Sequence, residues 1–169
     1  MTETRTVQDL TARLRDAGEA MLGLRGPLVA GEPWPLSAAY GTEPEADWGP
    51  REVLAHVNEM LPYWTRELEG VLAGDPGRAV PFGRVATDPD RLRRIADDRR
   101  RAAGELLDGI DAGLVTALGF LTERTDADLA RIGLHPTRGE LAIADSLDRF
   151  VVGHLEDHVE QLRTILASR

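Results

Sequence analysis

Apolar residues recur at alternating intervals of three and four positions through four long segments of the chain, and this period limits the possible folds more than any other feature. The segment 6–24 predicts a first helix with one apolar face. That face consists of Val7, Leu10, Leu14, Ala17, Met21, Leu24 and, just beyond the segment, Leu28. No segment shows the sustained alternation of apolar and polar residues that marks a half-buried strand, so we expect an all-α protein.

Prolines and glycines separate the predicted helices. The stretch 25–50 contains five prolines, so a regular helix cannot persist through it, and a connection of this length can cover a pocket. The second helix should begin at Asp47 or Trp48, with Pro50 in its first turn, and end at 70–74.

The third and fourth helices are expected at about 88–121 and 141–165, with irregular connections at 75–89 and 124–139. Three arginines at 99–101 interrupt the apolar stripe of the third helix, and we interpret them as a solvated face.

The chain has 169 residues, which is short for two independent cores, so 1–169 should form one domain, a four-helix bundle with long crossover connections. Its net charge of -9 repels phosphates, so neither nucleic acid nor an anionic membrane is an expected partner. There is no cysteine, so any metal must be held by His, Asp or Glu. Residues 1–6 are polar and the longest apolar stretch, 114–121, is short, which predicts a cytoplasmic location.

The chain has four histidines, and two of them, His154 and His158, are four positions apart in the last predicted helix. Side chains at this spacing lie one above the other, so both imidazoles can bind one ion. Both also continue the apolar face of that helix, where a buried imidazole needs a partner. Ordinary hydrogen bonds would provide a separate partner for each imidazole. A metal ion with a further ligand from a second helix would be a partner for both imidazoles at once.

His56 is the candidate for that further ligand, because it lies beside the inward face of the second predicted helix. Three neutral imidazoles leave a fourth coordination position open, as in catalytic sites. Trp48, Met60 and Tyr63 are predicted to line the pocket over the ion. Imidazole binds zinc, nickel, iron and manganese, so the expected cofactor is a divalent transition metal from this group.

Other candidates carry weaker signals. His135 lies in a predicted loop, where a histidine is normally solvated, so it is left out of the ligand set. Glu156 points away from His154 on the helix, which excludes the metalloprotease motif H-E-x-x-H. Asp157 and Glu160 can orient imidazoles, but we interpret them as part of a solvated acidic face.

Three stretches of the sequence resemble the DinB/YfiT-like metalloenzymes, and the similarity spans essentially the whole chain. They are 48–57 (WGPREVLAHV), 133–141 (GLHPTRGEL) and 150–162 (FVVGHLEDHVEQL). The resemblance implies a four-helix bundle with unusual connectivity and a divalent metal on three histidines, at the positions of His56, His154 and His158.

Characterised members of that family are transferases and isomerases that use a low-molecular-weight thiol such as bacillithiol, mycothiol or glutathione, which the metal binds and activates. The resemblance therefore implies a thiol S-transferase or isomerase. In such an enzyme, arginines near the opening would hold the carboxylates of the thiol. All 20 basic residues are arginine, a composition that suits an actinobacterial source and mycothiol.

Two alternatives stay open. The first is a metal-dependent hydrolase that uses a carboxylate base such as Glu59 or Asp157. The second is a non-catalytic metal-binding bundle that serves a stress response or dimerisation. The expected partners are a small thiol and an electrophilic substrate, and a homodimer is compatible with each alternative.

Overall fold

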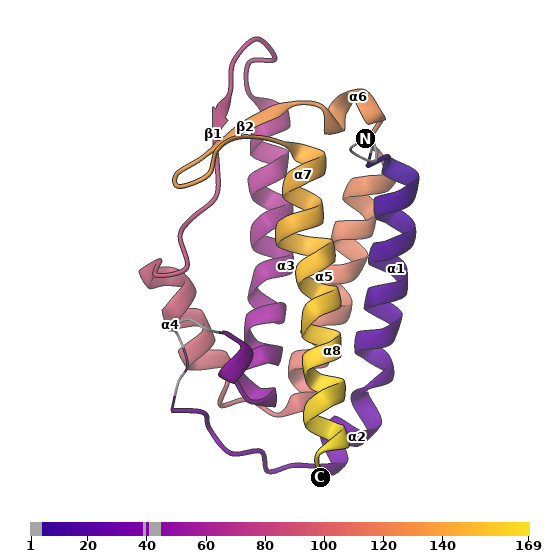
Figure 1. Ribbon diagram of the computed structural model, residues 1–169, viewed down its shortest axis with the longest axis vertical. Coiled ribbons are helices and arrows are strands. Elements are labelled where there is room, and N and C mark those ends of the chain that lie inside the picture. Colours follow the sequence, from indigo (N-terminus) through magenta and orange to yellow (C-terminus); the bar gives the residue numbers. More distant parts are fainter. Residues whose placement is uncertain (1–4, 39, 41–44) are drawn as a thin grey trace.

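Four long helices lie side by side in the computed structural model, which describes residues 5–38, 40 and 45–169 (Figure 1). They pack in a ring, because α1 contacts α5 and α8, and α3 contacts the same two helices. Their bounds are α1 Val7–Gly23, α3 Pro50–Ala73, α5 Ala103–Thr122 and α8 Gly153–Ala167. The shorter helices are α2 Arg25–Ala30, α4 Pro89–Asp98, α6 Asp126–Leu129 and α7 Ile143–Leu147. The chain is mostly helical, as the apolar period predicts.

The stripe of α1 lies in the core, where Leu10, Leu14 and Met21 have no exposed surface. The helix begins where predicted because Thr6 caps it. The Thr6 hydroxyl accepts a hydrogen bond from the backbone N–H of Asp9, and the Asp9 carboxylate accepts one from the Thr6 backbone. In the part of the chain that the structure describes, no helix combines the length and apolar character needed to cross a bilayer.

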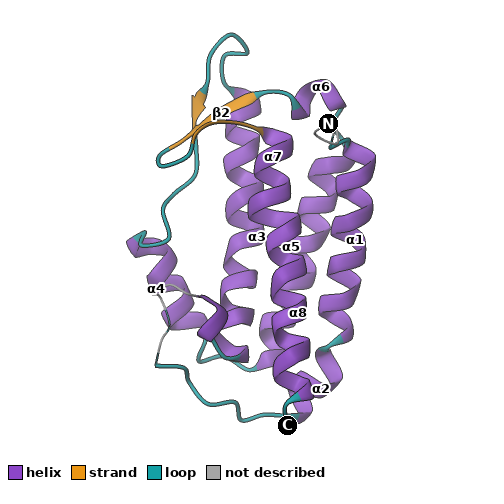
Figure 2. Cartoon of the chain, viewed as in Figure 1, coloured by secondary structure: helices purple, strands orange, loops and turns teal. Residues whose placement is uncertain are grey.

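A small sheet lies against α3, and the prediction of an all-α fold did not include it (Figure 2). Its strands, in spatial order, are β1 Val80–Pro81, β2 Ile132–His135 and β3 Gly139–Ala142. β1 is parallel to β2, and β2 forms an antiparallel hairpin with β3. Gly139 begins β3 with a φ of 73°, which a glycine adopts without strain. Strands of two to four residues are too short to show an alternating pattern in the sequence.

The predicted third helix is broken into α4 and α5, and Arg99 is not on a solvated face. Its guanidinium donates to the carboxylate of fully buried Glu52 at 3.1 Å and to the Ser37 carbonyl at 2.9 Å, and it lies over the Tyr40 ring. A buried carboxylate needs a charged partner of this kind. Arg99, the C-cap residue of α4, supplies this partner.

The described parts of the connection at 25–50 include regular structure that was not predicted. It contains α2 and a short 3-10 helix, η1 Glu45–Asp47, so α3 begins at Pro50 instead of at Asp47 or Trp48. The predicted break at Pro44 lies outside the described residues.

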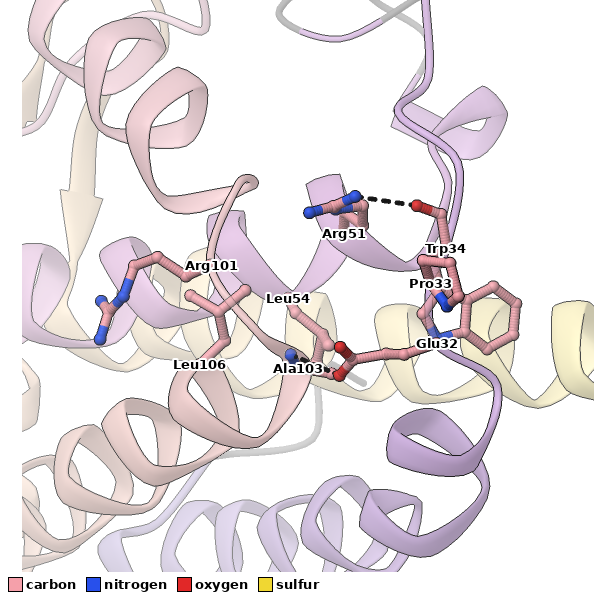
Figure 3. Close-up of a pocket in the computed structure, with 8 residues that line it drawn as sticks. All are labelled: Glu32, Pro33, Trp34, Arg51, Leu54, Arg101, Ala103 and Leu106. Atoms are coloured by element: carbon pink, nitrogen blue, oxygen red, sulfur yellow. Dashed lines mark hydrogen bonds between the residues drawn. The ribbon is translucent and has the colours of Figure 1, made fainter.

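Figure 3 shows where this connection meets the start of α5. Glu32 accepts a hydrogen bond from the Ala103 backbone at 2.8 Å, and Arg51 donates to the Trp34 carbonyl at 3.0 Å. The cavity between these residues measures about 40 Å³, which suits one or two water molecules.

The last predicted helix contains three consecutive segments, α7, the π-helix η2 Asp148–Val152, and α8. At the junction, the backbone N–H of Gly153 donates to the Asp148 carbonyl, and a Cβ on Gly153 would lie 2.7 Å from that oxygen. Gly153 therefore permits the wider turn immediately before His154. Single π turns of this kind recur at functional sites.

Candidate metal centre

Three histidine side chains meet between α3 and α8. The Nε2 atom of His154 lies 2.9 Å from that of His56 and 3.1 Å from that of His158. The three rings are steeply inclined to one another, at 80° to 85°, so their nitrogens converge instead of their faces. His56 and His158 are buried, while 30% of the His154 side chain is exposed. The structure thus brings together the three histidines that the sequence singles out.

Hydrogen bonds to Nδ1 leave Nε2 of two rings ready to bind an ion. Nδ1 of His56 donates to Glu59 Oε1 at 3.1 Å, and Nδ1 of His158 donates to Gln161 Oε1 at 2.9 Å. The Gln161 amide nitrogen donates to three backbone carbonyls, those of Glu45, Ala46 and Trp48. This fixes the amide with its oxygen toward His158. In the resulting tautomers the Nε2 lone pairs of His56 and His158 face the same space, where a cation relieves their repulsion.

Glu45 brings a carboxylate to the same point. Its Oε2 lies 3.2 Å from Nε2 of His154, 3.5 Å from Nε2 of His158 and 3.8 Å from Nε2 of His56. Its other oxygen pairs with Arg91. Glu45 was not predicted from the sequence, because a single acidic residue in an irregular connection belongs to no period. The available signal was the length of that connection, which is typical of a segment that covers a pocket.

These four side chains fit a small divalent cation. Their ligand atoms all lie within 4.8 Å of one another. The pairs of ligand atoms that include His154 Nε2 or Glu45 Oε2 lie 2.9 to 3.8 Å apart. Four ligand atoms arranged tetrahedrally around zinc, with bonds near 2.1 Å, lie about 3.4 Å apart, which is within this range. Imidazole nitrogen and carboxylate oxygen are donors that zinc, nickel, iron and manganese all accept. The Nδ1 hydrogen bonds are those that usually orient metal-binding histidines.

The electrostatics of the cluster favour the protonation states that metal binding requires. Burial lowers the pKa of His56 to about 4, although the hydrogen bond to Glu59 works in the opposite direction. Burial acts to raise the pKa of Glu45, but the interactions of its carboxylate with His154, His158 and His56 outweigh burial and hold that pKa well below its usual range. Burial likewise acts against ionised Glu59, whose pKa is nevertheless lowered by His56 and Arg84. At neutral pH His56 is therefore neutral and both carboxylates are charged.

A cavity of about 600 Å³ opens beside the cluster, and Glu45, His56 and His154 form part of its wall. The rest of the wall comes from Trp64, η2, the β2–β3 hairpin, Arg91 of α4, and the segment between β1 and α4, which runs beside α3 in Figure 1. This volume is ample for a small-molecule substrate. The cluster is thus reachable from one side.

Comparison with protein families decides the assignment. The family model of the DinB superfamily matches residues 4–162. The chain belongs to the DinB superfamily. The matched region contains all four residues of the cluster. Comparisons with curated proteins and with solved structures give no match.

None of the three residues predicted to line the pocket is among the described residues that form this cavity wall. Trp48 is 2% exposed and meets the His56 ring edge to face, with 5.7 Å between ring centres. Met60 is fully buried in the core. Tyr63 packs against Arg84, whose guanidinium lies 3.7 Å from the ring centre. Trp48 and Tyr63 therefore do not line the cavity, but they pack against His56 and Arg84, which do.

His135 is buried and lines the cavity, so the expectation of a solvated loop histidine is wrong. β2 turns it inward because burial alternates along that strand, where Leu134 faces out. Its ring stacks on Phe150 at 5.2 Å, and its Nδ1 accepts a hydrogen bond from the Thr137 backbone. In the described part of this DinB-superfamily protein, His135 does not belong to the cluster of ligand atoms.

Asp157 and Glu160 are both exposed on α8, and Glu160 pairs with Arg163. The orienting contacts to the imidazoles come from Glu59 and Gln161 instead. Glu59 is three residues from His56 on one helix, so its spacing was a usable signal for this contact.

Proposed function

We propose that the protein is a metal-dependent S-transferase that binds a low-molecular-weight thiol at the cluster of Glu45, His56, His154 and His158. A divalent ion bound there would lower the pKa of a coordinated thiol toward neutrality. The chain supplies the ligands, their orientation and an open approach past His154. The thiol proton passes to solvent, and the sulfur forms a bond to a carbon of the electrophile as the leaving group departs.

The proposal is supported by the contacts of the described carboxylates around the cluster, which leave none of them free to act as a base. In the described part of the chain, the acids near the histidines are already engaged. Glu59 binds His56 with one oxygen and Arg84 with the other. Asp157 is exposed and does not line the cavity. The predicted hydrolase needs one of these two acids as a base toward water, whereas a thiolate needs no base once formed.

The openness of the cluster favours catalysis over a structural role. Four protein ligands can close a structural site, so a thiol would enter here as a fifth ligand or displace Glu45 Oε2, and it needs access to the cluster. Here the side chain of His154 is 30% exposed, and it forms part of a cavity wall together with His56 and Glu45. A substrate in that cavity would lie directly beside the ligands.

A thiol-conjugation assay tests the proposal. Protein loaded with zinc, nickel, iron or manganese is incubated with mycothiol, bacillithiol or glutathione and a panel of electrophiles, and adducts are measured by mass spectrometry. We expect a metal-dependent adduct with at least one thiol, lost in His158→Ala and retained in the matched surface variant Asp157→Asn.

Two results would contradict the transferase. Metal-dependent ester hydrolysis without any thiol adduct, lost in Glu59→Gln protein that is fully loaded with metal, would establish the hydrolase. Metal binding that raises the melting temperature without turnover of either kind would establish the non-catalytic bundle.

A further inference from the structure

Two arginines at one end of the cavity have charges that no described acidic side chain neutralises. Arg138 and Arg149 both line the cavity, and neither guanidinium forms an ion pair or hydrogen bond with a residue that the structure describes. Arg138 lies in the β2–β3 hairpin, with its guanidinium 5.9 Å from the ring centre of Phe150. Arg149 directly precedes Phe150 in η2. Both cations therefore border the Phe150 end of the cavity.

The other arginines of the cavity wall are already neutralised. Arg84 pairs with Glu59, and Arg91 pairs with Glu45. Both of these acids belong to the surroundings of the histidines, so the cluster end of the cavity has matched charges.

The acids closest to Arg149 in the sequence are also engaged. Asp145 and Asp148 both pair with Arg5, and Asp148 also pairs with Arg13. They border a separate hollow together with Arg149 and form no ion pair with it. In a protein of net charge -9, the Phe150 end of the cavity thus keeps two positive charges.

An aromatic wall connects the cluster to these arginines. Phe150 precedes His154 by four residues, and Trp64 follows His56 by eight, which places them about one and two helical turns from the cluster. The Trp64 and Phe150 rings stack at 4.4 Å and 8°, and His135 stacks on Phe150. Such a wall favours a flat apolar group over a hydrated polar one.

We propose that the Phe150 end of the cavity binds the carboxylate of a flat, conjugated or aromatic acid, whose other end reaches the metal cluster. Guanidinium groups bind carboxylates through charge-assisted hydrogen bonds, and the aromatic wall receives the planar body. This inference rests on the proposed function for the reaction at the cluster. Binding of the carboxylate itself requires no metal, so the two can fail separately.

Isothermal titration calorimetry with trans-cinnamate tests the proposal, on zinc-loaded and on chelator-treated protein. We expect saturable binding to both forms. The double variant Arg138→Gln/Arg149→Gln should bind cinnamate about ten-fold more weakly or worse. Cinnamamide, which lacks the charge, and acetate, which lacks the ring, should each bind the unaltered protein more weakly than cinnamate.

The matched control is Arg78→Gln/Arg93→Gln, which removes two positive charges from side chains that are 84% and 68% exposed and outside the cavity. It should bind cinnamate as the unaltered protein does. Equal weakening in both double variants, equal binding of cinnamate and cinnamamide, or no saturable binding of cinnamate would each overturn the proposal.

Zinc content separates this inference from the proposed function. The Arg138→Gln/Arg149→Gln variant should hold as much zinc as the unaltered protein, so weaker cinnamate binding reports the loss of the arginines alone. Cinnamate binding that persists in a protein without thiol-transferase activity would contradict the proposed function and leave the carboxylate site standing.

Discussion

The two sides of the helical core differ in what they bury. Among the described residues, neither α1 nor α5 buries a charged or titratable side chain. α3 buries Glu52, His56 and Glu59, and α8 buries His158. Each of these four has a charged or hydrogen-bonding partner. The α1–α5 side stabilises the fold by apolar burial. On the α3–α8 side, the burial of polar groups costs free energy, which their partners offset only in part.

Removal of one ligand on the α3–α8 side should have the largest effect. His158→Ala should lower zinc affinity by more than about 100-fold, because it deletes an Nε2 atom at the centre of the cluster. Calorimetric titration with zinc measures the loss. His135→Ala is the matched control, since it removes another buried imidazole that is not part of the cluster and should leave zinc affinity unchanged. Equal losses in both variants would contradict the ligand assignment.

On the apolar side, Leu14→Ala should have the opposite profile. Leu14 has no exposed surface, so its truncation should lower the free energy of unfolding by about 2–5 kcal/mol. Urea denaturation of the chelator-treated protein measures this change. Zinc affinity at a temperature where the variant is folded should stay the same. A loss of zinc affinity as large as that of His158→Ala would show that the two sides are not separable.

A change in a residue that orients a ligand should have a smaller effect. Glu59→Gln keeps the size of the side chain but removes the charge that orients His56 and pairs with Arg84. We expect zinc affinity to fall by roughly 10–100-fold, as is usual for groups that orient a ligand. Glu160→Gln, on the exposed face of α8, should leave zinc affinity unchanged. Unchanged zinc affinity in Glu59→Gln would remove Glu59 from the site.

The smallest expected effect is a pH dependence of stability. Burial lowers the pKa of His56 from 6.5 to about 4 in the folded, metal-free protein. The unfolded chain therefore takes up a proton as the pH falls through 6.5, whereas the folded state resists it. His56 thus contributes a loss of stability on acidification, which is complete near pH 4.

Chelator-treated protein should accordingly lose about 2 kcal/mol of unfolding free energy between pH 6.5 and about 5. His56→Asn should remove most of this slope, which urea titrations at each pH will measure. Stability that is constant or rises on acidification in this window would contradict a buried neutral His56.

The sequence could predict the parts of the site that regular helices position. His154 and His158 share a face because they are four residues apart on one helix, and the apolar stripe of α3 turns His56 toward them. Glu45 and Arg99 could not be predicted in this way. Each lies in or beside an irregular segment, where its direction depends on contacts with distant residues, such as Gln161 for η1.

The sheet and the π turn were also beyond the sequence pattern. β2 and β3 have four residues each, so their inward positions, including His135, do not form a detectable period. The π turn at η2 adds one residue to a helix whose apolar spacing otherwise looks regular. The identity of the metal, the identity of the thiol and the formation of a homodimer remain predictions.

An anomalous-difference map from a crystal of the zinc-soaked protein, recorded at the zinc absorption edge, tests the central claim most directly. The convergence of the three imidazoles predicts one strong peak at about 2.1 Å from Nε2 of His56, His154 and His158, with Glu45 Oε2 at a similar distance. A map with no peak among these atoms, or with zinc bound only elsewhere on the surface, would contradict it.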